Sequence, residues 1–258
     1  MNDRPLSVGR LLLKTHELYW QHFLTFVGLL AIPHLPVAFP SVLPDLVRTH
    51  VGVVGVLLVV AWGLVYLVAW TALIWAVAAA LRGEEIGAGL AFSRVRLLGL
   101  GRLVWSYLIA LCLFLLMVLA GAVLIGVVGA FARAIGRPLA ALFGLVVVGS
   151  TLWWFLRLLF LPQVVVLEGR GGLAAISRCA ELVKGRRLRV LVILLLFTLL
   201  EGLLTWALGS VPVLRYLAGL LVAPLGAIWV TLLYYERVDP GLLSPAKILS
   251  RGMAPRLS

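Results

Sequence analysis

The chain has 258 residues, of which 63% are hydrophobic and only 12% are charged. Soluble domains carry about 25% charged residues, so this composition leaves too little polar surface for a water-exposed globule and excludes that class. A lipid bilayer is the solvent that accommodates such a sequence. The net charge of +12 comes from Lys and Arg scattered between apolar runs. We therefore expect anionic lipid headgroups as partners, and no nucleic acid.

Residues 1–22 predict an amphipathic helix lying in the headgroup plane, because Arg10, Lys14, Glu17 and Gln21 recur at helical spacing opposite an apolar face. Six apolar runs follow, each near the roughly 20 residues that a helix needs to cross a bilayer. These runs are 23–43, 53–80, 103–129, 139–161, 190–211 and 214–235. The fold class is therefore an all-α integral membrane bundle of about six transmembrane helices.

The predicted division of the chain has three parts: an N-terminal helix over 1–22, a membrane domain over 23–235 and a tail over 236–258. The first apolar run contains Pro33 and two further prolines, so we expect this helix to kink or unwind at its outer end. We expect no cleavable signal peptide before it, because no small-residue cleavage site lies in a suitable place.

Lys and Arg fall mainly on one side of the six runs. The segments before the first run and after the second, fourth and sixth hold 17 of them, against four in the opposite loops and one, Arg157, inside the fourth run. The opposite-side residues are Arg48, Arg133, Arg137 and Arg215. Cytoplasmic loops are enriched in Lys and Arg, so this distribution predicts that both ends of the chain are cytoplasmic.

Two of the basic segments also predict short interfacial helices. After the fourth run, an apolar stripe lies opposite a charged one; the two stripes are Leu173, Ile176, Ala180 and Val183, and Arg178, Glu181 and Lys184. Residues 89–94 (Gly-Leu-Ala-Phe-Ser-Arg) are similar to residues 172–178 (Gly-Leu-Ala-Ala-Ile-Ser-Arg). This similarity favours an internal repeat of an interfacial helix followed by a membrane hairpin, with chance similarity of Leu-rich sequence as the alternative.

The basic segments supply the first group of candidate site residues. Guanidinium and ammonium groups bind phosphate, so the candidate lipid-headgroup contacts are Arg178, Lys184, Arg186 and Arg187. Glu168, just past the fourth run, is expected to pair with one of these cations. Tyr234 and Tyr235 are expected to anchor the last helix at headgroup level, where amphipathic rings are stable.

Two charged residues inside the apolar runs form the second group. Arg157 lies about 6 Å from the cytoplasmic end of its helix and can snorkel to the headgroups, whereas Glu201 lies roughly 16 Å deep. An intramembrane charge is a functional candidate by default. Three interpretations of Glu201 stay open: a protonated carboxyl bonded within the bundle, a proton or cation site of a small transporter or channel, and exposure to a wet vestibule.

Small residues at four-residue spacing allow helices to pack closely in lipid. Two such stripes occur: Ala122, Gly126 and Ala130, and Gly219, Ala223 and Ala227. Internal packing is the main interpretation, and a seam for a homodimer or another membrane protein is the alternative.

Catalytic constellations do not emerge from the sequence. The four histidines form no HExxH pattern, the two cysteines have no metal-ligand spacing, and there is no phosphate-binding loop. Ser150 and His34 are a remote candidate dyad for an intramembrane hydrolase, although no nucleophile-elbow glycines surround Ser150. We expect a non-enzymatic protein with no catalytic residue, cofactor or metal ion.

Two stretches resemble a known family. They are residues 168–189, with Glu168-Gly169, Arg178 and Lys184-Gly185, and residues 224–237, with Tyr234-Tyr235-Glu236-Arg237. Both resemble the membrane domain of bacterial glycerophosphoryl diester phosphodiesterases and its stand-alone relatives. The family usually has Ser in place of Cys179, and Tyr-Asp, one further residue and Arg in place of Tyr235-Glu236-Arg237. The resemblance implies a protein of the bacterial plasma (inner) membrane, without the catalytic domain because only a 21-residue tail follows Arg237.

Overall fold

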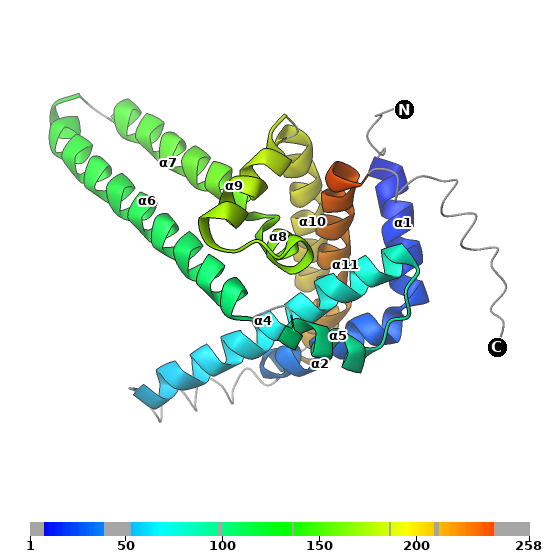
Figure 1. The fold of residues 1–258 in the computed structure, drawn as a ribbon. Helices are drawn as coiled ribbons and strands as arrows, with labels where there is room; N and C mark the ends of the chain where they lie inside the picture. Colours follow the sequence, from blue (N-terminus) through cyan, green and yellow to red (C-terminus); the bar gives the residue numbers. More distant parts are fainter. Residues whose placement is uncertain are drawn as a thin grey trace, which may run out of the picture. The chain divides into compact units, whose positions relative to one another are not determined.

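The structure, a computed structural model, describes residues 8–38, 53–97, 100–135, 137–185, 187–208 and 212–239. The regular structure in these ranges is α-helical (Figure 1). The helices are α1 (Val8–Gln21), α2 (Phe23–Ala38), α4 (Val53–Arg82), α5 (Ala88–Leu97), α6 (Leu100–Ile135), α7 (Arg137–Leu158), α8 (Leu161–Glu168), α9 (Gly172–Val183), α10 (Arg187–Leu208) and α11 (Pro212–Val238). The all-α prediction is confirmed.

The chain forms two compact units. Unit 1 comprises residues 1–100 and 191–258, and unit 2 comprises residues 101–190. In unit 1, α11 packs against α1, α2 and α4, while α5 packs against α4. The fully buried side chains of this unit come from several of these helices: Leu11, Phe26, Leu29, Leu30, Leu73, Ile74, Ile228 and Leu232. Unit 1 therefore has a continuous apolar core around α2, α4 and α11.

Helix α4 shows a change of surroundings along its length. Residues 71–79 are buried on every face, because α2, α5 and α11 surround this half. The other half exposes apolar side chains, among them Leu57 and Leu64. A helix that is apolar on all sides needs either a protein core or lipid around it. The exposed half is suited to lipid.

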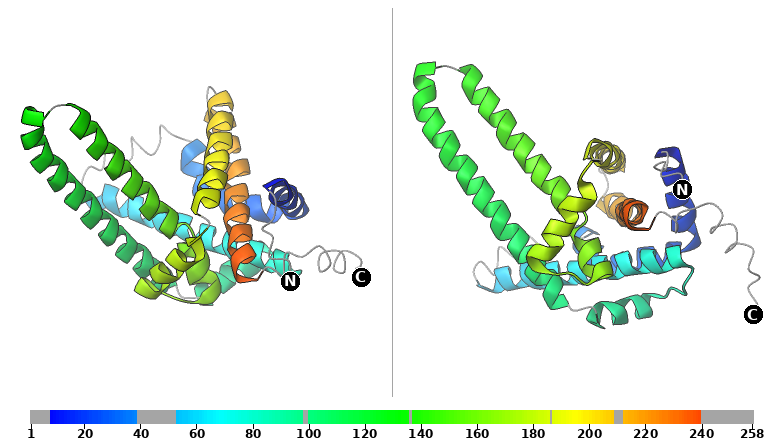
Figure 2. Two further views of the ribbon diagram at one scale, coloured as in Figure 1. Left: turned by 90° about the horizontal axis from the view of Figure 1, so that it is seen from above. Right: turned by 45° about the horizontal axis from the view of Figure 1, so that its top comes forward.

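Unit 2 contains a long helical pair and a short hairpin. In Figure 2, α6 and α7 run antiparallel alongside each other, and α8 and α9 follow at one end of the pair. Helix α9 packs against α7 and α8. Many large apolar side chains of α6 and α7 are exposed, including Leu116 at 64% and Leu145 at 72%. Contiguous apolar surface of this kind marks a contact with lipid or another protein.

Four stretches of helix are long and apolar enough to cross a membrane within the described part of the chain. They are Val60–Arg82, Leu100–Gly121, Gly144–Glu168 and Leu217–Val238. These four candidate spans indicate a multi-pass membrane protein. The other two predicted spans form helices α2, with a shorter apolar stretch over Phe23–His34, and α10. A count of six spans stays a prediction.

The proline-rich first span forms a helix for most of its predicted length. Helix α2 continues through Pro33 and Pro36 and is described as far as Ala38. The predicted kink or unwinding at its outer end lies largely outside the described residues, as does Pro40.

The N-terminal helix is amphipathic as predicted, but its apolar face contacts protein. Leu11 and Leu18 of α1 are buried, and the Tyr19 hydroxyl donates a hydrogen bond of 3.0 Å to the carbonyl oxygen of Leu221. Helix α1 packs on α11 and α2, whereas Arg10 and other polar side chains remain exposed. The helix is therefore part of unit 1.

One of the two small-residue stripes faces a neighbouring helix. A Cβ added at Gly219 would lie 3.8 Å from His34 of α2, and Ala227 is fully buried. This contact agrees with internal packing in unit 1. The other stripe, Ala122, Gly126 and Ala130, lies in α6 but outside the side chains that the structure describes.

Candidate functional site

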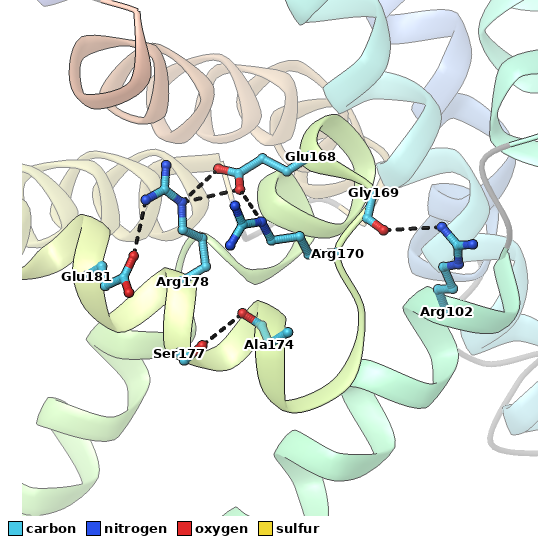
Figure 3. A network of polar contacts seen from close by, with 8 residues as sticks. All are labelled: Arg102, Glu168, Gly169, Arg170, Ala174, Ser177, Arg178 and Glu181. Carbon is cyan, nitrogen blue, oxygen red and sulfur yellow. Dashed lines mark hydrogen bonds and ion pairs between the residues drawn. The ribbon is translucent and has the colours of Figure 1, made fainter.

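Glu168 is the centre of a network of charged side chains in unit 2 (Figure 3). Its carboxylate accepts hydrogen bonds from Nε of Arg178 at 3.1 and 3.2 Å, and it lies 3.0 Å from Nε of Arg170. Arg178 also donates from Nη1 to Glu181 at 3.1 Å. The Glu168 side chain is only 14% exposed. Its negative charge is therefore held away from water between two guanidinium groups.

The reversal between α8 and α9 brings these residues together. Gly169 ends α8 in the left-handed conformation, with a φ of 68°, which glycine adopts without strain. After this reversal α9 runs back across α8, so Arg178 lies opposite Glu168. Glu168 is thus paired with a predicted cation, Arg178, and also with Arg170, which was not among the predicted headgroup contacts.

Two residues of α6 fix this hairpin in place. Arg102 donates from Nη1 to the carbonyl oxygen of Gly169 at 3.2 Å. The buried Ser106 hydroxyl donates to the Arg102 carbonyl at 2.6 Å and accepts the backbone N–H of Gly172 at 2.8 Å. Ser106 therefore satisfies the first N–H of α9, which has no partner within the helix itself.

Replacing Ser106 with alanine is expected to lower the free energy of unfolding of unit 2 by about 1–3 kcal/mol, because the buried N–H of Gly172 loses its acceptor. Ser177→Ala is the matched control. The Ser177 hydroxyl is exposed and bonds only the Ala174 carbonyl at 3.0 Å, so we expect a change below about 0.5 kcal/mol. Thermal unfolding in detergent micelles measures both, and equal changes would refute the role of Ser106.

The structure separates the four predicted headgroup contacts. Arg178 is compensated by two carboxylates, and its hydrogen bonds to Glu168 and Glu181 raise the pKa of its guanidinium. Lys184 and Arg187 are exposed, at the end of α9 and the start of α10. Arg186 lies outside the described residues. The charge of Arg178 is therefore compensated inside the protein, whereas Lys184 and Arg187 remain exposed.

Arg157 and Arg187 meet at one aromatic ring. The guanidinium carbon of Arg157 lies 3.9 Å from the centre of the Trp153 ring, and that of Arg187 lies 5.9 Å from it. Trp153 and Arg157 are one helical turn apart on α7. This junction was not predicted, because nothing in the sequence connects the end of α7 to the start of α10.

The predicted intramembrane site is only partly described. The backbone of Glu201 belongs to α10, whereas its side chain lies outside the described part of the structure. Its three interpretations stay predictions. Ser150 lies in α7 of unit 2 and His34 in α2 of unit 1, where Nδ1 of His34 is 2.9 Å from the Leu30 carbonyl oxygen.

The two tyrosines expected at the headgroups are buried. Tyr234 is 2% exposed and Tyr235 is 8% exposed. The Tyr235 hydroxyl accepts a hydrogen bond of 3.1 Å from Arg82, which also pairs with Glu84. These contacts tie the end of α4 to the end of α11 inside unit 1, and the headgroup level of the two tyrosines stays a prediction.

The segments that contain α5 and α9 share several features at a spacing of 84 residues, which agrees with the predicted internal repeat. In each, an acid lies ten residues before an arginine, a serine hydroxyl bonds the carbonyl three residues earlier, and two positions are almost fully buried. The pairs are Glu84 and Glu168, Ala91 and Ala175, Ser93 and Ser177, Arg94 and Arg178, and Val95 and Cys179. In unit 1 the hydrogen bond from Arg82 is the main cause that lowers the pKa of Glu84, and the charge of Arg94 lowers this pKa further.

A cavity of about 640 Å³ lies between α6 and α7. Its lining is mostly apolar, with polar groups from Tyr107, Thr151 and Trp154. Nε1 of Trp154 is buried without a hydrogen-bond partner. The volume is typical of a ligand pocket, and the lining is suited to an apolar molecule.

No protein-family model, curated protein or solved structure matches this chain. Among the described residues, no group of three His, Cys, Asp or Glu side chains could hold a metal ion. The resemblance to the membrane domain of the phosphodiesterases therefore stays a prediction, and the geometry of unit 2 is the ground for assigning a function.

Proposed function

We propose that this protein is a non-enzymatic, multi-pass component of the bacterial plasma membrane that binds anionic lipids at its cytoplasmic face. It acts there as a scaffold or as a lipid-interacting subunit. The four candidate spans support the membrane part of the proposal. The family resemblance and the 17-to-4 distribution of Lys and Arg support the bacterial membrane and the cytoplasmic placement of both ends.

One observation carries the lipid part of the proposal: cationic side chains gather at one end of unit 2. Helix α6 begins at this end, α7 finishes there and α10 starts there, and the α8–α9 hairpin lies between them. We call this group the basic end; it consists of Arg102, Arg157, Arg170, Arg178, Lys184 and Arg187. Directly beyond it, α6 and α7 expose apolar side chains. Positive charge bordering apolar surface matches an anionic lipid, whose headgroup and acyl chains adjoin in the same way.

Lipid analysis of the purified protein tests this proposal. We expect phosphatidylglycerol and cardiolipin to be enriched over phosphatidylethanolamine relative to the source membrane. Replacing Lys184, Arg186 and Arg187 together with glutamine should reduce the enrichment. The matched control replaces three arginines that are predicted on the opposite side of the membrane, Arg133, Arg137 and Arg215, and should leave the enrichment unchanged. Unmodified protein that carries lipids in the proportions of the bulk membrane would contradict the proposal.

A further inference from the structure

Two guanidinium groups from different helices lie close to the ring of Trp153. Arg157 lies one turn further along α7 and stacks at 3.9 Å from the ring centre. Arg187, the first residue of α10, lies at 5.9 Å. Both distances are measured to the same ring, so the two guanidinium carbons are within about 10 Å of each other. Two positive charges thus converge on one partly exposed indole.

Neither charge has an acidic partner among the described side chains. The nearby acids of unit 2 pair with other arginines: Glu168 pairs with Arg170 and Arg178, and Glu181 pairs with Arg178. The face of an indole attracts a cation, but it does not cancel the repulsion between two of them. The three side chains therefore concentrate positive charge in one place, and a bound anion would reduce this repulsion.

The surroundings of the two arginines favour a lipid as the source of that anion. Arg157 is followed by only one more residue of α7, and Arg187 begins α10, so both lie at helix ends. Leu188, next to Arg187 in the chain, has an apolar side chain that is 74% exposed. Trp153 itself is 38% exposed, and tryptophan is typical of the headgroup level of membranes.

We propose that Trp153, Arg157 and Arg187 form a binding site for the phosphate group of an anionic membrane lipid. This inference rests on the proposed function and assigns one site to it. Each planar guanidinium donates two parallel N–H groups to phosphate oxygens, and the Trp153 ring holds the guanidiniums in position. The exposed Leu188 side chain, next to Arg187, contacts an acyl chain of the same lipid.

The site differs from the other arginine–tryptophan contact in the described part of the chain. In unit 1, Arg94 lies 5.6 Å from the centre of the Trp75 ring, and it is the one guanidinium described there. Among the described side chains, there is no second guanidinium group at Trp75 to bind a phosphate from another side. Arg94→Gln is therefore a control that removes the same charge from the same kind of contact.

Native mass spectrometry of the full-length protein in detergent, with added phosphatidylglycerol, phosphatidylcholine or inorganic phosphate, tests the site. We expect Arg157→Gln and Arg187→Gln each to weaken phosphatidylglycerol binding by about tenfold, because each removes a charge-assisted pair of hydrogen bonds. Arg157→Lys should bind more tightly than Arg157→Gln but less tightly than the unmodified protein. An ammonium keeps the charge, but it neither stacks on the ring as a planar group nor donates two parallel hydrogen bonds to phosphate. Arg94→Gln should leave the affinity within about twofold.

Each alternative result has one meaning. Equal losses in the Arg94→Gln and Arg187→Gln proteins would overturn the site in favour of general surface charge. Inorganic phosphate that binds as tightly as phosphatidylglycerol would overturn the lipid as the source of the anion.

Unmodified protein that retains anionic lipid, with no change in the Arg157→Gln and Arg187→Gln proteins, would overturn the site and leave the proposed function standing. No retention by unmodified protein would refute the proposed function as well. The Arg157→Lys protein, which keeps the charge, shows whether folding accounts for a loss.

Discussion

Replacing Glu168 with glutamine is expected to destabilise unit 2 by about 2 kcal/mol. Glu168 is only 14% exposed and compensates two guanidinium groups, of which that of Arg178 is 28% exposed. Removing one partner of a buried ion pair costs about 3–5 kcal/mol, because the other charge stays desolvated. Solvent reaches both partners here in part, which reduces the expected cost. Unfolding in detergent micelles, followed by circular dichroism, measures it.

The matched control for this prediction is Glu181→Gln. Glu181 also pairs with Arg178, but its side chain is 65% exposed, so the expected loss is below about 1 kcal/mol. A double-mutant cycle between Glu168→Gln and Arg178→Gln isolates the pair itself. Equal losses for the two glutamates, or no coupling in the cycle, would show that Glu168 does not organise the hairpin.

Replacing Gly226 with leucine is expected to destabilise unit 1 by about 3 kcal/mol. A Cβ at this position of α11 would lie 2.9 Å from Cζ and 3.0 Å from Cε1 of Phe197 on α10, inside the normal contact distance. Phe197 is itself packed against Trp229, with ring centres 5.5 Å apart, so it cannot move away freely. Extra carbon atoms in a packed interface force side chains off their rotamers and shift the backbone.

Gly202 provides the control, because it lies on α10 and a Cβ there would meet nothing within 4 Å. Gly202→Leu should cost less than about 0.5 kcal/mol. Truncating Phe197 to alanine in the Gly226→Leu protein should restore part of the loss, since it makes room for the new side chain. Thermal unfolding of the three proteins measures this, and a Gly226→Leu protein as stable as Gly202→Leu would refute the close contact of Phe197 with Gly226.

The helices that the sequence predicted best are those defined by local composition. The runs predicted over 53–80 and 214–235 correspond to α4 and α11, because an apolar run of the right length needs no information from other parts of the chain. The prediction for the fourth run, over 139–161, missed a boundary between two helices. The chain turns at Leu159–Phe160 and continues as α8 to Glu168, but apolar composition is unbroken across that turn and gave no boundary.

The apolar stripe predicted after the fourth run illustrates a second limit. Ile176 and Val183 of α9 are buried, whereas Leu173 is 65% exposed. Helical periodicity identifies an apolar face but not what covers it, and the cover here is α7 and α8 as well as solvent or lipid. Tyr234 and Tyr235 show the same ambiguity: both are buried in unit 1, while their predicted headgroup level in the membrane stays a prediction.

For the candidate site, the sequence predicted the kind of residue involved but not the contacts that each residue makes. A basic segment after the fourth run predicted headgroup contacts, and Glu168 was expected to pair with one of its cations, without an indication of which one. Sequence treats all these cations alike, whereas the structure distinguishes the compensated Arg178 from Arg157 and Arg187 at Trp153. That distinction depends on how α7 and α10 meet, which is a property of the fold.

Sidedness of thiol labelling tests the central claim, a multi-pass protein whose basic segments share the cytoplasmic face. Probe cysteines replace Ser93 on α5, Ser177 on α9 and Ala134 near the end of α6 in a Cys112→Ala background. The native Cys179 is fully buried, and burial together with the Glu168 charge raises the pKa of its thiol to about 12, so it is unreactive.

A membrane-impermeant maleimide is applied to sealed right-side-out vesicles and then to permeabilised ones. We predict that Ala134→Cys is labelled in sealed vesicles, and that Ser93→Cys and Ser177→Cys are labelled only after permeabilisation. Labelling of Ser93→Cys or Ser177→Cys from the outside of sealed vesicles would contradict the account.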